Sequence, residues 1–497
     1  MDTGQDLILV LDAGTTSTRA MAFARDGALV GVAQRALAQH YPQPGWVEHD
    51  PQEIWQSTLA CAREVVGGAG GAARFAGLGI TNQRETVVAW DRHSGEPLAR
   101  AIVWQDRRTA EFCDTLRAGG HEAEVQRRTG LLLDPYFSGT KMRWLLDHSG
   151  EVAAANEAGR LAFGTVESWL VFKLTARDSG GGLHLTDASN ASRTLLLALD
   201  GAQFDEGLCD LFGIPLASLP HVVDCAGNFG DTAPGLFDGA IAIRGLVGDQ
   251  QAATIGQGCL APGEVKATYG TGAFVLANMG PALPRSRHRL LGTVLCQLDD
   301  KRSYALEGSV FVAGSLIQWL RDSLGIIASA SETAALAASV PDSGGVVLVP
   351  ALSGLGAPHW RPEARGALTG ISFATTRAHL ARAALEAMAG QTHDLMTAFA
   401  ADGAVWSKLK IDGGMSANDW LAQDLADVLA LEVERPAFVE TTALGAAMLA
   451  AVGAGWFAGL EEAAAAMRGP VRRFDPAMPA EVRAARLAGW GEALAKV

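Results

Sequence analysis

The sequence is poor in the features that mark secreted, metal-clustered or nucleic-acid-binding proteins. Its six cysteines are scattered without a CxxC pair, so neither a disulfide framework nor a zinc site is predicted. Basic residues number 40 against 54 acidic ones, and no clustered Lys/Arg face is present, which argues against a nucleic-acid partner. No secretory segment is visible, because the first apolar run is short and lacks a preceding basic region. We therefore expect free thiols and a cytoplasmic location.

Only residues 441–460 lack charge for long enough to suggest a membrane span. Much of this stretch is Ala and Gly, which bring little hydrophobic driving force, and Gly445, Gly453 and Gly455 suit close helix packing. We predict one buried helix and no stable membrane insertion. The Ala-rich residues 328–339 and 461–467 predict two more helices. With 497 residues, 48% of them hydrophobic, the chain can form two large domains or three smaller ones.

The first segment with a functional pattern is residues 7–24. Five apolar residues lead into DAGTTSTR (residues 12–19) and a second apolar run follows, which predicts a hairpin. Gly14 and the hydroxyls of this turn can approach a phosphate, and Asp12 can address a metal ion. A Walker-type loop is excluded, because no GK[ST] and no following helix are present. From this segment alone, a plain turn is the alternative.

Two later segments have related patterns. Residues 264–278 predict a second hairpin with a Gly/Thr turn at 270–272, and residues 409–418 place Gly413 and Gly414 between a strand and an N-capped helix. In this order, the three turns resemble the two phosphate loops and the adenosine loop of the superfamily that contains actin, hexokinase and the heat-shock ATPases. The sequence therefore predicts a duplicated nucleotide-binding protein.

Residues that could determine substrate specificity lie between the first two of these turns. Arg84 and Glu85 follow a strand pattern, at the edge where α/β sheets bind ligands. They can point the same way only if the loop curls, and an exposed salt-bridged turn is the alternative. Trp104, Tyr136, in a predicted loop at 134–141, and Phe274 could wall a small pocket, although single aromatic residues more often belong to the core.

Asp249 is the best candidate for a catalytic base. It follows a short apolar strand and precedes Gln250. Phosphoryl transfer needs a group that accepts the proton of the attacking hydroxyl, and a carboxylate beside an amide suits a polyol. The alternative is that Asp249 is the N-cap of a helix beginning near Ala252.

Over almost its whole length the chain resembles the FGGY carbohydrate kinases, and within them the members that phosphorylate glycerol. The segments that carry the resemblance are DAGTTSTR, YPQPGWVEHDP, ITNQRET, AIVWQDRRTAE, DPYFSGTK, NASRT, GDQQAA, TYGTG, ALEGSVFVAG, IQWLRD, GLGAPHW and IDGGMSAN. NQRET, DPYFSGT and GDQQA are also specific within the family, because its pentulose and hexulose kinases carry different residues there.

The resemblance implies an α/β fold with two ribonuclease-H-like domains, of the actin and hexokinase ATPase type, around a central cleft. The expected domains are residues 1–254 and 255–497. The implied reaction is ATP-dependent phosphorylation of glycerol to sn-glycerol 3-phosphate, with Mg²⁺. A homodimer or homotetramer is also expected, and residues 366–386 are assigned to structure and dimer packing.

The resemblance also implies a role for individual residues. Asp249 would be the general base, and Asp12 with Asp249 would orient magnesium. Glycerol would be bound by Arg84, Glu85, Trp104, Tyr136, Asp249, Gln250 and Phe274. The nucleotide would be bound by Thr15, Thr16, Ser17, Arg19, Thr271, Gly314, Gln318, Gly414 and Asn418.

Two other functions stay open at this point. The same chemistry could act on another small polyol or triose, such as erythritol or dihydroxyacetone. The chain could instead be an ATP-driven switch of the actin or chaperone kind. Against the switch stand NQRET and DPYFSGT, because a pure switch has no reason to carry substrate segments.

Overall fold

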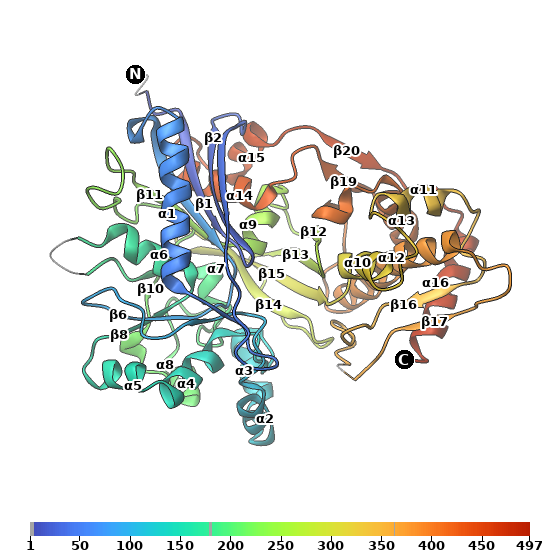
Figure 1. Cartoon of the computed structure of the whole chain (residues 1–497), viewed down its shortest axis with the longest axis horizontal. Coiled ribbons are helices and arrows are strands. Elements are labelled where there is room, and N and C mark those ends of the chain that lie inside the picture. The colour runs from blue at the N-terminus through green and yellow to red at the C-terminus, as the bar shows by residue number, and fades with distance from the viewer. Residues whose placement is uncertain (1–3, 178–180, 362) are drawn as a thin grey trace.

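The computed structural model describes residues 4–177, 181–361 and 363–497. The chain builds two large sheets, the first mostly from the blue strands and the second from the green to red strands of Figure 1. The first sheet has the strand order β11-β5-β1-β2-β3, with the bounds β1 (Leu7–Ala13), β2 (Ser17–Ala24), β3 (Leu29–Ala36), β5 (Phe75–Asn82) and β11 (Ile243–Gly248).

The second sheet repeats this arrangement and adds an edge strand on each side. Its order is β14-β15-β13-β12-β18-β19-β20, with β12 (Glu264–Tyr269), β13 (Ala273–Gly280), β14 (Leu291–Leu298), β15 (Lys301–Val310), β18 (Lys408–Asp412), β19 (Val433–Pro436) and β20 (Val471–Phe474). In both sheets an antiparallel meander of three strands is continued by two parallel strands. This is the ribonuclease-H-like pattern, so both predicted hairpins and the predicted fold class are confirmed.

The remaining strands form small two-stranded sheets. They pair β4 (Glu48–His49) with β7 (Ala101–Ile102), β6 (Val88–Asp91) with β8 (Leu161–Gly164), β9 (Leu185–Asp187) with β10 (His221–Val223), and β16 (Val347–Val349) with β17 (Ala367–Thr369). The helices up to β12 are α1 (Pro51–Gly68), α2 (Ala110–Ala118), α3 (Glu122–Thr129), α4 (Ser138–His148), α5 (Gly150–Glu157), α6 (Val166–Thr175), α7 (Ala188–Ala191), α8 (Glu206–Phe212) and α9 (Asp249–Gly256).

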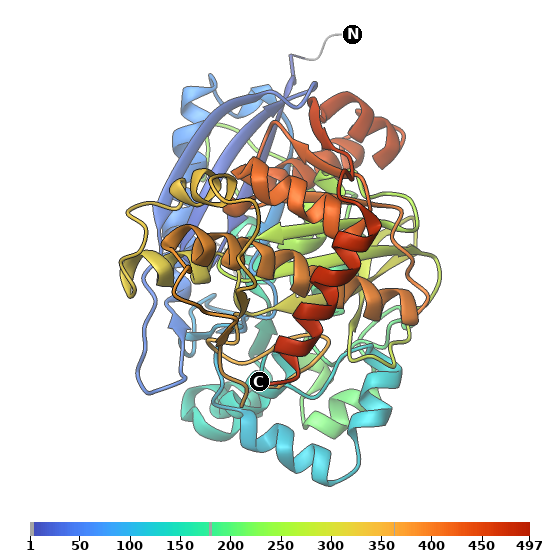
Figure 2. The same cartoon turned by 90° about the vertical axis from the view of Figure 1, so that its right-hand side faces the viewer.

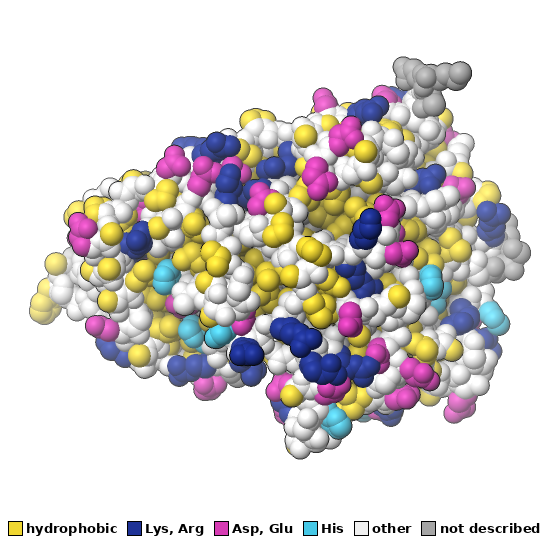
Figure 3. Space-filling view, turned by 180° about the vertical axis from the view of Figure 1, so that it is seen from behind, with side chains coloured by type: hydrophobic (Ala, Val, Ile, Leu, Met, Phe, Trp, Pro, Cys, Tyr) yellow, Lys and Arg dark blue, Asp and Glu magenta, His cyan; other side chains and the backbone are white. Residues whose placement is uncertain are grey.

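The later helices are α10 (Gly314–Asp322), α11 (Glu332–Ala338), α12 (Arg377–Ala401), α13 (Asp419–Leu429), α14 (Thr441–Gly453), α15 (Leu460–Met467) and α16 (Ala480–Leu494). Short 3₁₀ turns span Ala72–Arg74, Leu216–Ser218 and Gly414–Ala417. Figure 2 shows α16, in red, crossing the outside of the part that carries the second sheet. The two predicted Ala-rich helices are α11 and α15. On the face drawn in Figure 3, charged side chains of both signs are spread among hydrophobic ones.

The first sheet is covered on both faces, which explains its continuous apolar strand. Along β1, Leu7, Leu9 and Leu11 pack into a core with α1 and α6, since alternate side chains point to one face. Ile8 and Val10 point to the other face and pack on α14 and α15. A strand buried on both faces needs apolar residues at successive positions, as β1 has.

The helix predicted over 441–460 is interrupted. α14 ends at Gly453, where Gly455 takes a left-handed φ of 76°, and α15 begins only at Leu460. Within the described ranges no helix is both long enough and apolar enough to cross a membrane. Two smaller predictions also need correction. Residues from Ser138 on belong to α4 and not to a loop, and α9 begins at Asp249 itself, with Gly248 at the N-cap position.

Close packing of α14 against α9 holds α14 beside the first sheet. A Cβ atom added at Gly445 would lie 1.9 Å from the carbonyl oxygen of Ala252, and one at Gly256 would lie 2.0 Å from that of Thr441. Only glycine lets the two helix backbones approach this closely. The predicted small-residue packing of this segment is therefore seen at Gly445.

We expect Gly445→Ala to destabilise the protein by about 1–3 kcal/mol, because the added methyl group overlaps the backbone of α9. Gly489→Ala is the matched control, since Gly489 lies inside α16 with nothing within 4 Å of the added Cβ, and alanine favours a helix by about 0.5–1 kcal/mol. Urea unfolding followed by circular dichroism measures both variants. Equal stability of the two would contradict the packing described for α14.

Candidate functional site

Arg84 and Asp249 meet at the carboxyl ends of two neighbouring strands. Arg84 follows β5 and Asp249 opens α9 directly after β11, which pairs parallel with β5. The Nε atom of Arg84 lies 3.2 Å from Oδ1 of Asp249, and Nη2 lies 3.4 Å from the hydroxyl of Tyr136. Burial raises the pKa of Asp249 to about 6, although Arg84 acts to lower it. A carboxylate with this pKa can accept a proton near neutral pH.

Glu85 points toward Arg84 because the loop does curl. Its φ is +61°, and the N–H of Thr86 donates to the carbonyl of Arg84 at 2.8 Å. Ser138, at the start of α4, donates through Oγ to the carbonyl of Glu85 at 3.1 Å. Both Arg84 and Glu85 are at most 2% exposed, so the alternative of an exposed salt-bridged turn is wrong.

Three aromatic rings form one wall beside these charges. Trp104 meets Tyr136 edge to face at a centroid distance of 5.7 Å, and Phe274 at 6.3 Å. All three are partly exposed, unlike core aromatic residues such as Trp90 and Trp169. Phe274 belongs to β13 of the second sheet, whereas Trp104 and Tyr136 lie in loops of the N-terminal half, so the wall joins side chains from both halves of the chain.

Gln250 lies next to Asp249 with a fixed orientation. The buried ammonium group of Lys266 donates to Oε1 of Gln250 at 2.6 Å and to Oγ1 of Thr268 at 2.9 Å. The amide oxygen is thereby occupied, which leaves the NH₂ group of Gln250 as its free donor. Burial lowers the pKa of Lys266.

The first hairpin turn lies beside the aromatic wall. The indole Nε1 of Trp104 donates to Oγ1 of Thr15 at 2.9 Å, so the wall contacts this turn directly. The N–H of Gly14 donates to the carbonyl of Ser17 at 3.0 Å, which closes the turn, and Thr16 at its tip is exposed. Phe274 follows the second turn by two residues, so Trp104 lies between the two predicted phosphate loops.

The other residues predicted for the nucleotide gather around the second turn. The N–H groups of Ala313 and Gly314 donate to the carbonyls of Thr271 and Gly270 at 2.9 and 2.8 Å. A Cβ at Gly314 would lie 2.5 Å from the Gly270 oxygen and 3.6 Å from the Met415 side chain. Turn 270–272, the start of α10 and the loop after β18 are therefore in contact.

Gly414, Gln318 and Asn418 lie on these same segments. Gly414 is exposed with open space around its Cβ position, and Gln318 is exposed on α10. Asn418 caps α13 by accepting from the N–H of Leu421, as predicted for the N-capped helix, and donates to Oγ1 of Thr333 at 3.2 Å. Open space beside a helix start is what an approaching nucleotide needs.

Asp12 in β1 and Arg19 in β2 lie opposite each other. Arg19 pairs with Asp12 and with Glu440, both at 2.5 Å. Burial raises the pKa of Asp12, against the opposing effect of Arg19. Sequence reasoning missed Glu440, because it lies far away in the chain.

Sequence reasoning also gave no role to Arg193, Glu307 and Lys266, all fully buried beside the predicted glycerol residues. Part of their signal was present, since Glu307 directly follows Ala305 and Leu306 in β15, and Lys266 lies between Val265 and Ala267 in β12. A charge buried in a sheet needs a partner, which the sequence alone does not identify.

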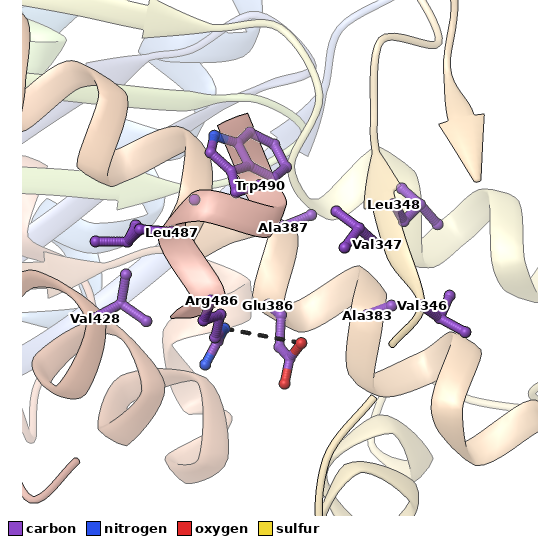
Figure 4. A pocket seen from close by; sticks show the side chains of 11 residues that line it. Val346, Val347, Leu348, Ala383, Glu386, Ala387, Val428, Arg486, Leu487 and Trp490 are labelled. Atoms are coloured by element: carbon purple, nitrogen blue, oxygen red, sulfur yellow. Dashed lines mark ion pairs between the residues drawn. The ribbon is translucent and has the colours of Figure 1, made fainter. Parts of the chain in front are cut away.

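A separate crevice lies away from these residues. It is lined by α12, α16 and β16 residues, and Figure 4 shows Arg486 facing Glu386 within it, at 3.8 Å. None of the predicted site residues lines this crevice.

Comparisons with known proteins agree with this arrangement. The N-terminal domain of the FGGY family of carbohydrate kinases matches residues 7–256, and the C-terminal domain matches residues 265–454. Glycerol kinase of Rhodospirillum centenum is 54% identical over 488 residues, which are 98% of this chain and 97% of that protein. Glycerol kinase of Rhodospirillum rubrum is 53% identical over 492 residues, covering 99% and 98% of the two chains.

Solved structures show the same fold. The crystal structure of Plasmodium falciparum glycerol kinase with ADP is 34% identical and superimposes with a TM-score of 0.93, covering 99% of this chain and 98% of that one. Xylulose kinase from Lactobacillus acidophilus, 19% identical, gives 0.88 over 99% and 97% of the two chains. Fold and topology thus define the actin and hexokinase class of ATPase. Within that class, the chain belongs to the FGGY family of carbohydrate kinases.

We expect Trp104→Phe to keep the aromatic wall and lose the hydrogen bond to Thr15. A neutral hydrogen bond contributes about 0.5–1.5 kcal/mol, so the KM for ATP should rise by roughly two- to tenfold with little change in glycerol affinity. Steady-state kinetics with each substrate varied measures this, with Trp456→Phe as control, since Trp456 lies between α14 and α15 and packs against their apolar cluster. A rise confined to the KM for glycerol would contradict the link to the phosphate turn.

Proposed function

We propose that this chain phosphorylates glycerol, transferring the γ-phosphoryl group of ATP to give sn-glycerol 3-phosphate and ADP. The observation that carries the proposal is the grouping of Asp249, Arg84 and Tyr136 with an aromatic wall beside a hydroxyl-rich turn. A triol offers three hydroxyls and a thin apolar edge, and this set of side chains suits both. The glycerol kinases that are more than half identical over nearly the whole chain support the same substrate.

Asp249 is the residue we assign as general base. Its carboxylate accepts the proton of a terminal hydroxyl, the hydroxyl oxygen forms a bond to the γ-phosphorus, and the bond to the β-phosphate oxygen breaks, releasing ADP. Arg84, Glu85, Tyr136 and Gln250 bind the hydroxyls, while Trp104 and Phe274 contact the carbon chain. Because the free NH₂ of Gln250 is a donor, it is suited to a hydroxyl oxygen.

The nucleotide contacts follow from the three connected turns. Backbone N–H groups and hydroxyls of Thr15, Thr16 and Ser17, with Arg19, face the β- and γ-phosphates, and Thr271 contributes from the second turn. Gly314, Gln318, Gly414 and Asn418 line the rest of the nucleotide. Support comes from the open space at Gly414 and from the ADP complex of the Plasmodium relative.

Asp12 and Asp249 are the residues we propose to hold Mg²⁺. Both offer carboxylate oxygens, the ligands that this ion prefers. In the described ranges no group of three or more His, Cys, Asp or Glu side chains is placed to hold a metal ion. This fits an ion that arrives with ATP, because such Mg²⁺ needs only one or two protein carboxylates besides phosphate and water. Bound Mg²⁺ neutralises charge on the transferred phosphoryl group.

The cellular location and the domain boundaries also belong to this proposal. We place the protein in the cytoplasm, since all six cysteines are buried and unpaired. We keep residues 1–254 and 255–497 as the two domains, although α14 and α15 pack on the first sheet. No nucleic-acid partner is proposed.

We also propose a homodimer or homotetramer. Ile371, 60% exposed, and the fully exposed Phe373 follow β17 within the segment assigned to dimer packing. Exposed apolar side chains in one segment favour an interface. Sedimentation velocity at micromolar concentration should show a species heavier than the 51.9 kDa monomer, and a monomer alone would contradict this proposal.

We expect Asp249→Asn to fold normally and to lose at least about a hundredfold in kcat, because the amide keeps the shape and cannot accept the proton. ADP release with Mg²⁺ and ATP is measured on glycerol, dihydroxyacetone, erythritol and xylulose. The wild type should prefer glycerol, since Trp104 packs against both Tyr136 and Phe274 and these rings leave little room for a longer carbon chain. Preference for erythritol would support the alternative substrate, and near-normal turnover by Asp249→Asn would place the base elsewhere.

A further inference from the structure

Glu307 is a fully buried carboxylate in β15 of the second sheet, and its partners come from residues near the first sheet. Its Oε2 lies 2.7 Å from Nη1 of Arg84, and its Oε1 accepts from Nη2 of Arg84 at 3.2 Å. The two groups therefore form a forked, two-bond pair. Such a pair fixes the plane of a guanidinium group as well as its position.

A second arginine joins the same carboxylate to Glu85. Arg193, two residues after α7, donates through Nη2 to Oε1 of Glu307 at 3.1 Å and through Nε to Oε1 of Glu85 at 2.6 Å. Its guanidinium lies over the rings of Phe137 and Tyr136, 5.2 and 5.7 Å from their centroids. Glu307 thus contacts Arg84 directly and Glu85 through one intervening side chain.

We propose that Glu307 is a positioning residue of the glycerol site, which orients Arg84 directly and Glu85 through Arg193. This inference rests on the proposed function, because its effect is on the binding of the polyol. Glu307 itself contacts no atom of the substrate in this scheme. Its role is to hold two substrate-binding side chains in place from the opposite sheet.

The orientation of Arg84 shows what this positioning achieves. With both terminal nitrogens held by Glu307, only Nε of Arg84 lies near Asp249, as an ion pair at 3.2 Å from Oδ1. Without the fork, Arg84 would be free to turn toward Asp249 and form the two-bond pair there. That pairing would occupy the carboxylate that must accept the proton of glycerol.

The two buried arginines and two buried glutamates around Glu307 neutralise one another only when all four are present. Arg84 and Arg193 face Glu85 and Glu307, and every one of these side chains is at most 2% exposed. Lys266, Asp249 and Lys141 are further charged groups close to them. Although burial acts to raise it, Arg193 and Arg84 lower the pKa of Glu307 to about 2, so the carboxylate stays charged. Removing one member leaves an uncompensated buried charge.

The test is Glu307→Gln, which keeps the shape and removes the charge. Because a charge-assisted fork is lost, we expect the glycerol KM to rise about tenfold or more and kcat to fall, with the KM for ATP within about twofold of wild type. Isothermal titration with glycerol alone should show the same loss of affinity. This binding measurement is independent of turnover.

Asp424→Asn is the matched control. Asp424 is a buried carboxylate in α13 with its own two-bond pair to Arg486, which lies at the crevice of Figure 4, outside the glycerol site. We expect it to lower the melting temperature and to leave the glycerol KM unchanged. Equal effects of both variants on glycerol, or an unchanged glycerol affinity in Glu307→Gln, would overturn the proposal.

If Glu307→Gln does not yield folded protein, Arg193→Lys keeps the charge and loses the link between Glu307 and Glu85. It should raise the glycerol KM and spare the KM for ATP, and wild-type affinity for glycerol would overturn the proposal. Failure of the wild type to use glycerol would reject the proposed function separately. A selective loss in the polyol KM of these variants, on whichever polyol the wild type uses, would still support the positioning role.

Discussion

The buried guanidinium of Arg84 is the charge on which the substrate side of this molecule depends. A group of this kind is stable inside a protein only when carboxylates surround it, and here Glu307, Asp249 and Glu85 do so at 2.7 to 3.9 Å. Those carboxylates come from different segments, so satisfying one cation brings them together. The residue that we propose to bind the substrate is in this way also the residue that brings these carboxylates together.

A second constraint acts through the backbone. Glu85 reaches its place only with a left-handed φ, which costs free energy for a residue with a side chain. The surrounding contacts hold that conformation, namely the bond from Ser138 to its carbonyl and the ion pair with Arg193. Backbone strain is thus concentrated at one of the two adjacent charged residues that we propose to bind the same ligand.

The sequence was sufficient for features that depend on neighbours in the chain. Apolar runs and glycine turns predicted both hairpins, and the position of Asp249 after an apolar strand was correct. It was insufficient where distant segments meet. Glu307 and Arg193 are 114 residues apart, and no local pattern identifies them as partners. The interruption of the 441–460 helix was missed for a related reason, because low charge describes a buried segment without giving its shape.

The return of α14 and α15 to the first sheet has a consequence for synthesis on the ribosome. The face of β1 formed by Ile8 and Val10 is made among the first residues, and its covering helices are made among the last. While the intervening segments are translated, this apolar face lacks its cover from α14 and α15. Chains with such an interval are exposed to aggregation, so chaperone binding to nascent chains would protect this face until α14 emerges.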